Sequence, residues 1–231
     1  MTAAAATLLA FTLTAPASGA TGVPPDAVSQ LERVSRFHAG LDRYAVEIRV
    51  RVDPGDSGAP TQVLAARTAR RGPVMLQELS SFVVLTRPDL RLMVDRASRT
   101  IYLNAEPPDV PAALPGLDPA AALRAARERG YAVEARGVGD AVEVAFRPAD
   151  AHPTVVFTFG RDEPRLRRMQ LVRAAGVREG PARIEVDYRW RDPEAEGAAP
   201  FEAAHYVRRQ GGAWAPAPAF AGYRVVDSRA R

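Results

Sequence analysis

Cysteine and lysine are both missing from the 231-residue sequence. Without cysteine the chain has no disulfide, no thiol nucleophile and no N-terminal cysteine that could be acylated as a membrane tether. Without lysine, all 31 basic residues are arginine. A GC-rich genome explains that bias more simply than selection for guanidinium groups does.

Aromatic residues and excess charge are also scarce. Only 7% of residues are aromatic, and the formal net charge is +4. The arginines alternate along expected strands instead of forming a basic patch with interleaved aromatics, which is the usual mark of a nucleic-acid-binding protein. We therefore expect solvated strand faces and no nucleic-acid partner.

Residues 1–20 contain no charged side chain, have an apolar centre and end in Ser18-Gly19-Ala20. This pattern predicts a signal peptide cleaved after Ala20, or alternatively after Ala17. An uncleaved anchor fits less well, because threonines and a proline interrupt a run that is barely long enough to span a bilayer. The sequence thus predicts export to the periplasm without a lipid anchor, with residues 21–231 forming one domain.

The segment 29–52 predicts a helix that leads directly into a strand. Val28, Leu31 and Val34 recur at helical spacing, Asp26 or Ser29 could cap the helix, and Gly40 is placed to end it. From Tyr44 to Val52 the apolar residues alternate with Glu47 and arginines, as in a half-buried strand.

Further segments with alternating apolar residues predict strands at 62–70, 74–85, 90–94, 100–103, 142–146, 155–159, 166–172, 183–191, 201–208 and 223–226. In 183–191 the charged residues, Glu185 among them, are expected to face outward. A second helix is predicted from Pro119, with Asp118 as its cap and Gly130 as its stop.

Short connections between successive strands favour antiparallel pairing. One apolar and one charged face per strand indicate a single sheet with one side buried. About nine strands under two helices predict a mainly β fold, an incomplete antiparallel β-barrel with a curved single sheet and a helical lid.

Several segments resemble the LolA-type carriers of outer-membrane lipoproteins and their LolA/LolB superfamily. They are the helix-to-strand opening at 29–52, the Arg87-Pro88 motif at 85–92, the order of segments from Arg147-Pro148 to Ile184, and the closing segment 220–227. The resemblance covers most of the mature chain, and its most specific parts are the opening segment and Arg87-Pro88.

The resemblance implies an apolar cavity that shelters lipoprotein acyl chains or another lipid during outer-membrane lipoprotein sorting. An inner-membrane donor complex and an outer-membrane acceptor are the implied protein partners, with the carrier itself a monomer. It also implies that Arg87 and Pro88 control the lid. Residues expected to line the apolar wall are Val46, Ile48, Val50, Leu90 and Leu92.

No nucleophile elbow, phosphate loop or catalytic cluster occurs in the sequence, and the three histidines have no metal-ligand spacing. We expect no catalytic residue, metal or cofactor, and no enzymatic activity. Two alternatives remain open: a carrier of apolar ligands, or a periplasmic sensor or protein-interaction module of the same superfamily that carries no lipid.

Overall fold

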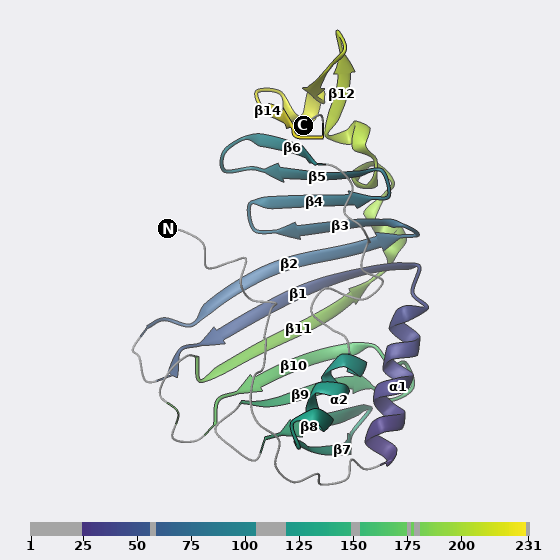
Figure 1. The fold of residues 1–231 in the computed structure, drawn as a ribbon, viewed down its shortest axis with the longest axis vertical. Helices are drawn as coiled ribbons and strands as arrows, with labels where there is room; N and C mark the ends of the chain where they lie inside the picture. The colour runs from purple at the N-terminus through teal and green to yellow at the C-terminus, as the bar shows by residue number, and fades with distance from the viewer. Residues whose placement is uncertain are drawn as a thin grey trace. The chain divides into compact units, whose positions relative to one another are not determined.

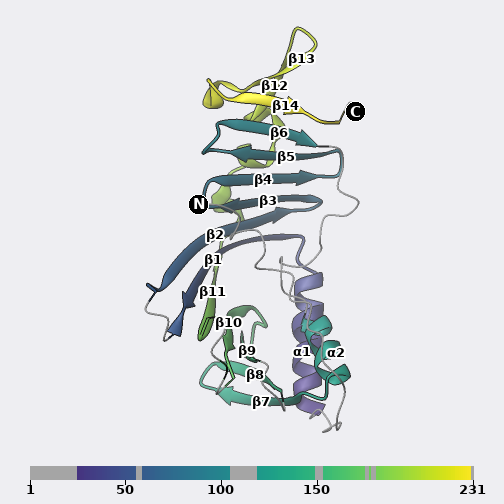
Figure 2. The same cartoon turned by 60° about the vertical axis from the view of Figure 1, so that its left-hand side comes forward.

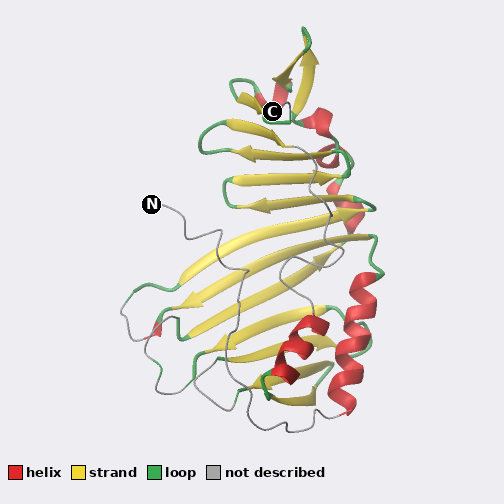
Figure 3. Ribbon diagram, in the orientation of Figure 1, coloured by secondary structure: helices red, strands yellow, loops and turns green. Residues whose placement is uncertain are grey.

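The computed structural model describes residues 25–55, 59–104, 119–148, 153–174, 177 and 181–229. The predicted signal peptide, Asp118 and His152 lie outside these residues. The described chain is mainly strand, with two α-helices and several short 3-10 helices (Figures 1 and 3).

The two α-helices are α1 (Pro25–Ala39) and α2 (Pro119–Glu128). The strands are β1 (Arg43–Asp53), β2 (Gln62–Arg71), β3 (Val74–Leu79), β4 (Phe82–Arg87), β5 (Leu90–Asp95), β6 (Thr100–Asn104), β7 (Ala132–Val138), β8 (Ala141–Arg147), β9 (Thr154–Gly160), β10 (Leu166–Val172), β11 (Arg183–Arg191), β12 (Val207–Gln210), β13 (Ala213–Pro216) and β14 (Arg224–Asp227). The 3-10 helices are η2 (Pro193–Glu196), η3 (Ala199–Phe201), η4 (Ala203–His205) and η5 (Pro218–Phe220).

Twelve strands form one open sheet in the order β14-β6-β5-β4-β3-β2-β1-β11-β10-β9-β8-β7, and β12 pairs with β13 in a separate hairpin. Consecutive strands from β2 to β6 and from β7 to β11 pair antiparallel. The predicted fold class, a mainly β protein with an open antiparallel sheet and few helices, is confirmed.

The chain divides into two compact units, which are described separately below. Unit 1 comprises residues 1–40, 50–63 and 111–187, and unit 2 comprises residues 41–49, 64–110 and 188–231. The sequence-based prediction of one domain over 21–231 remains a prediction.

In unit 1, α1 buries one stripe of its surface. Ala27, Leu31, Val34 and His38 are buried and lie four, three and four residues apart, which places them on one face of a helix. Helix α2 lies beside α1, on the same side of strands β7 and β8 (Figure 2). The two helices predicted to cover the sheet are therefore present.

Helix α2 begins at Pro119 and ends at Glu128, and Gly130 is its stop, as predicted. Gly130 has a φ of 65°, its N–H donates to the Arg127 carbonyl, and the Tyr131 N–H donates to the Ala126 carbonyl. This pair of hydrogen bonds is the Schellman arrangement, which requires a residue in the left-handed region. The prediction that Asp26 or Ser29 caps α1 is wrong, because α1 begins at Pro25.

The sheet of unit 1 contributes a row of aromatic and aliphatic residues to its core. Val144 on β8 pairs with Phe157 on β9, which pairs with Met169 on β10. Phe157 contacts Phe146 edge-on, with their ring centroids 5.6 Å apart. Aromatic pairs in this geometry stabilise a core beyond the area they bury.

One strand position departs from the alternation expected for 183–191. Glu185 was expected to face solvent, but it is buried, with only 8% of its surface exposed. The guanidinium groups of Arg51, Arg168 and Arg183 lie 2.8–3.7 Å from its carboxylate and cover it. The long arginine side chains bury this charge on the polar side of the sheet.

In unit 2, strands β2 to β6 form a meander whose register is continuous. Ala69, Leu76, Leu85, Leu92 and Leu103 are direct cross-strand neighbours in turn. All five are buried, and we call the side of the sheet that carries them the core face.

The C-terminal segment covers the core face. Phe201, Tyr206 and Val207 are buried in the same cluster, and Trp214, Phe220 and Tyr223 pack against it. The prediction of a strand over 201–208 is largely wrong, because 3-10 helices occupy 199–205 and only Val207 onward is strand.

Two other strand predictions for unit 2 need correction. The segment 74–85 is two strands joined at Ser80-Ser81, where Ser80 has a φ of 50°. The final strand, β14, pairs parallel with β6, whereas antiparallel pairing was expected. The predicted hairpin with a polar turn at 95–99 is confirmed, and Asp95 Oδ1 accepts hydrogen bonds from the N–H groups of Ala97 and Ser98.

Leu92 tests the packing of the core face. It is fully buried between Leu85 and Leu103, so Leu92→Ala should lower the free energy of unfolding by about 3 kcal/mol through lost transfer energy and the cavity left behind. Urea unfolding followed by the fluorescence of Trp190 and Trp214, both in unit 2, would measure this. Val63→Ala, at a side chain that is 49% exposed, should change stability by less than about 0.5 kcal/mol. Equal effects of the two substitutions would contradict a filled core face.

His38 makes the stability of unit 1 depend on pH. Burial lowers its pKa from 6.5 to about 4, while a hydrogen bond with the Pro164 backbone acts in the opposite direction. The unfolded state therefore binds more protons between these values, so stability is complete above pH 6.5 and falls as the pH drops toward 4. We expect a loss of about 2 kcal/mol between pH 8 and pH 5.

The comparison for this prediction is His38→Leu, which removes the titrating group. Urea unfolding followed by far-UV circular dichroism should show a smaller difference between pH 8 and pH 5 for the variant than for the parent. An unchanged difference would show that other groups cause the pH dependence.

Candidate functional site

No chemistry of metal binding is evident in the described part of the chain. None of its His, Asp and Glu residues form a group of three or more that could hold a metal ion. Neither of its α-helices is both long and apolar enough to cross a membrane. A pocket of about 40 Å³ in unit 1 is lined by charged residues such as Arg136 and Glu143, and it has room for a few water molecules only.

The five residues predicted to form an apolar wall do not share one surface. Leu90 and Leu92 are buried in the core face of unit 2, together with Ala45 of β1. Successive side chains of a strand point to opposite sides, so Val46 lies on the other side of β1. Ile48 follows Val46 on that side, and Val50 belongs to unit 1.

The register of β1 and β2 supports this placement. The Gly72 N–H donates to the Asp42 carbonyl at 2.8 Å. Continuing the antiparallel pairing from that hydrogen bond places Ala45 opposite Ala69, both in the buried cluster. It places Val46 opposite Thr68 and Ile48 opposite Ala66, on the side away from the core face.

We call this side of unit 2 the opposite face. Leu79 and Phe82 on it are cross-strand neighbours and are 38% and 36% exposed. The next row along the strands is half-buried, with Val84 paired to Met93 and Met93 paired to Tyr102. The half-exposed or exposed apolar residues of the opposite face are Ile48, Leu79, Phe82, Val84, Met93 and Tyr102.

Of this surface, sequence reasoning found only Ile48. It also named Val46, which lies on the same side of β1 but is fully buried. The hidden turn at Ser80-Ser81 merged two strands into one and obscured which residues share a side. With the turn in place, period-two alternation in β3, β4 and β5 assigns Leu79, Phe82, Val84 and Met93 to one face.

Arg87 holds the C-terminal segment onto the core face. Its Nη1 donates to the Phe201 carbonyl at 3.4 Å and to Glu202 Oε2 at 3.3 Å, and its Nε donates to Asp89 Oδ1 at 3.2 Å. The neighbouring Pro88 is exposed in the turn between β4 and β5. Within unit 2 the Arg-Pro motif therefore joins the strands to η3 and the residue that follows it. A role for Arg87 and Pro88 in controlling a lid remains a prediction.

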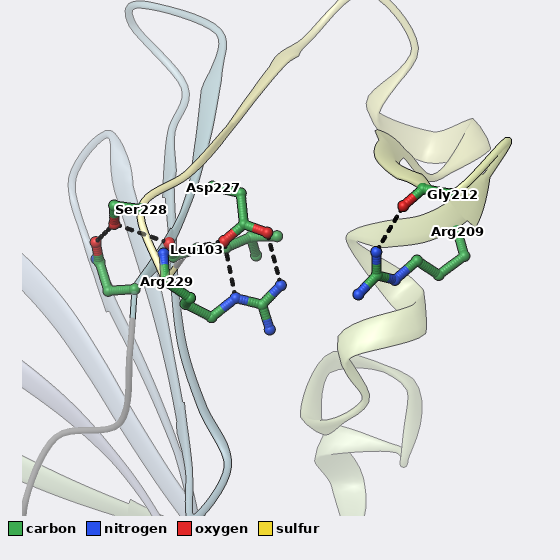
Figure 4. A network of polar contacts seen from close by, with 7 residues as sticks. Leu103, Arg209, Gly212, Asp227, Ser228 and Arg229 are labelled. Carbon is green, nitrogen blue, oxygen red and sulfur yellow. Dashed lines mark hydrogen bonds and ion pairs between the residues drawn. The ribbon is translucent and has the colours of Figure 1, made fainter. Parts of the chain in front are cut away.

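Polar contacts fasten the last strand at the end of the same sheet (Figure 4). Arg229 binds Asp227 through two hydrogen bonds of 2.9 and 2.8 Å, and this partner lowers the pKa of Asp227 to about 2. Ser228 Oγ donates to the Leu103 carbonyl and to Asn104 Oδ1. The guanidinium groups of Arg209 and Arg229 both lie over the Trp214 ring, 4.2 and 5.2 Å from its centroid.

No family model matches the sequence, and no curated protein matches it. Among solved structures, a LolA superfamily protein of Nitrosomonas europaea is 10% identical, with a TM-score of 0.29, over 74% of this chain and 96% of that chain. A putative outer membrane lipoprotein-sorting protein domain of Vibrio parahaemolyticus is 9% identical, with a TM-score of 0.31, over 74% and 96%. An uncharacterized conserved protein of Thermus thermophilus is 10% identical, with a TM-score of 0.43, over 87% and 99%.

These similarities concern the fold alone. One of them is to a member of the superfamily that the sequence resembles. What the protein binds has to be inferred from its own residues.

Arg87→Ala should loosen the C-terminal segment. It removes the hydrogen bonds to Phe201 and Glu202, so we expect amide hydrogen exchange across residues 199–207 to become roughly tenfold faster, equivalent to about 1.4 kcal/mol of local stability. Mass-spectrometric hydrogen exchange would measure it. Arg91→Ala, on the same hairpin but facing the other side, is the matched control and should leave this segment unchanged. Unaltered exchange in Arg87→Ala would contradict the clamp.

Proposed function

We propose that the protein is a periplasmic carrier that binds the acyl chains of a lipoprotein or another lipid on the opposite face of unit 2. The observation that carries the proposal is the set of apolar side chains left partly exposed there, from Ile48 on β1 to Tyr102 on β6. Their counterparts on the core face are fully covered by protein. Grouped apolar exposure of this kind marks interaction surfaces in soluble proteins.

The chemistry of this surface suits a flexible hydrocarbon chain. Leu79, Phe82, Val84 and Met93 contribute aliphatic, aromatic and thioether groups with no charge among them. Each methylene that leaves water contributes roughly 0.8 kcal/mol. A chain of sixteen carbons therefore gains on the order of 10 kcal/mol before the costs of association, which take several kcal/mol. Micromolar binding is within reach of such a surface.

We infer a transport role for this surface. The predicted signal peptide and the absence of cysteine favour a protein that is free in the periplasm. A soluble protein with an acyl-binding face can move a lipid-modified cargo through water between two membranes. We accordingly propose outer-membrane lipoprotein sorting as the process, with an inner-membrane donor complex and an outer-membrane acceptor as partners, and no catalytic step.

The alternative is a sensor or protein-interaction module that uses the same face to bind a protein segment. An apolar protein segment could bind to the same side chains. The two alternatives are distinguished by whether the purified protein contains bound lipid. Mass spectrometry of organic extracts after periplasmic expression should detect bound lipid if the carrier proposal is right. A lipid-free protein that also fails to bind acylated peptide would overturn it.

Ile48→Glu tests the face directly. A charge in the middle of an acyl-binding surface must be desolvated when the ligand binds, so we expect affinity for a fluorescently labelled N-palmitoyl peptide to fall at least about tenfold. Fluorescence anisotropy would measure the affinity, and thermal unfolding would verify that the variant is folded.

The matched control for Ile48→Glu is Arg49→Glu. Arg49 is the next residue of β1, is exposed and points to the other side of the strand. This variant should bind the peptide as the parent does. If a folded Ile48→Glu protein binds as tightly as Arg49→Glu, the opposite face is not the acyl-binding surface.

A further inference from the structure

The opposite face of unit 2 carries arginines at one end and its most exposed apolar side chains, Leu79 and Phe82, at the other. Cross-strand pairing arranges its side chains in three rows, each running across β2 to β6. The polar row, next to the turn that contains Pro88, consists of Arg70, Met75, Thr86, Arg91 and Asn104. The middle row consists of Thr68, Gln77, Val84, Met93 and Tyr102. The outer row consists of Ala66, Leu79, Phe82, Asp95 and Thr100.

The polar row carries positive charge without an acidic residue of its own. Arg91 is the exposed member of this row, whereas Met75 and Thr86 are buried. Arg91 forms no ion pair with any residue in the described ranges. Other arginines of unit 2 do form such pairs with Asp or Glu: they are Arg43, Arg67, Arg71, Arg87, Arg96, Arg191 and Arg229. Among the residues described, no carboxylate competes with an anion for the guanidinium group of Arg91.

A second polar group lies at the same end of the face. Tyr44 is the β1 residue opposite Arg70 when the pairing from Gly72 and Asp42 is continued, and Arg70 acts electrostatically on it. Its side chain is 3% exposed, and its hydroxyl has no hydrogen-bond partner among the residues described. A buried hydroxyl without a partner costs free energy, which a bound acceptor would recover.

The outer row contains no arginine. Its one acidic residue, Asp95, is occupied, since Oδ1 accepts from the backbone of Ala97 and Ser98 and Oδ2 accepts from Ser98 Oγ at 2.6 Å. Leu79 and Phe82 are the exposed members of this row. Polar and outer rows are four residues apart along each strand, roughly 13 Å, on the order of the length of a ten-carbon chain.

We propose that the cargo is an anionic amphiphile, an inference that rests on the proposed carrier function. Its phosphate or carboxylate head binds Arg91 at the polar row, and its acyl chain lies across the middle and outer rows. Arg70 and Tyr44 add positive potential and a donor at the same end. A guanidinium group binds phosphate and carboxylate by charge-assisted hydrogen bonds. The arrangement thus favours anionic lipids over uncharged lipids with the same chain.

The test compares two probes that differ only in the head. Lysophosphatidylglycerol and monopalmitoylglycerol, which has the same chain but no phosphate, would be titrated into the full protein below their critical micelle concentrations by isothermal titration calorimetry. We expect the anionic lipid to bind roughly tenfold more tightly. Arg91→Gln should remove most of this preference and leave the affinity for monopalmitoylglycerol unchanged. Arg99→Gln, an exposed arginine in the turn at the other end of the same hairpin, should keep the preference.

The other possible outcomes contradict either the position of the head group or the carrier proposal itself. Equal binding of both lipids by the parent, or an unchanged preference in Arg91→Gln, overturns the head assignment and leaves the carrier proposal standing. Binding of neither lipid overturns both. Glycerol 3-phosphate, which has the anionic group but no chain, should not bind measurably, and if it binds as tightly as the lipid, the site is one for a free anion.

Discussion

The packing of the C-terminal segment on the sheet of unit 2 decides which surface of that sheet is free. Phe201, Tyr206 and Val207 complete the core on one side, and Arg87 fastens the segment through the Phe201 carbonyl. The side chains on the other side of the same strands are not uniformly exposed. Val46, Thr68, Met75 and Thr86 are buried there, whereas Ile48, Leu79 and Phe82 remain at least partly exposed. A binding function for this sheet therefore depends on a contact made more than a hundred residues further along the chain.

This dependence explains why the residues predicted to form one apolar wall lie on different faces of the sheet. Val46 and Leu92 both have the alternating pattern of an inward-facing strand residue, yet they lie on opposite faces of the sheet. Alternation along one strand establishes which residues share a side, but it does not establish which sides of two strands coincide. The turn at Ser80-Ser81 lacks glycine, asparagine and aspartate, so only the weaker turn preference of serine marks the point where the chain reverses.

Local signals predicted the remainder well. Helical spacing located α1, proline and glycine bounded α2, and period-two alternation located most strands, because each of these depends on neighbours in sequence. Features that depend on distant residues escaped. Glu185 is buried only because Arg51, Arg168 and Arg183 from three strands converge on it. β14 is four residues long and pairs parallel with β6, a pairing for which short segments carry no distinct pattern.

The distribution of arginine bears on function in a way that composition alone does not. An ion pair between an arginine and a carboxylate on neighbouring strands adds little to the stability of the sheet when it is exposed to solvent. Arg91 is also exposed but has no such partner in the described chain, and it lies at the opposite end of the face from the exposed Leu79 and Phe82. An exposed guanidinium group is well solvated, so its position costs the fold little. When the acyl chain of a ligand binds to the neighbouring apolar side chains, it raises the effective concentration of the anionic head group beside Arg91. Arg91 therefore contributes most to the binding of a ligand that has both a chain and a charge. Hydrocarbon and charge on one face thus favour a ligand that has both.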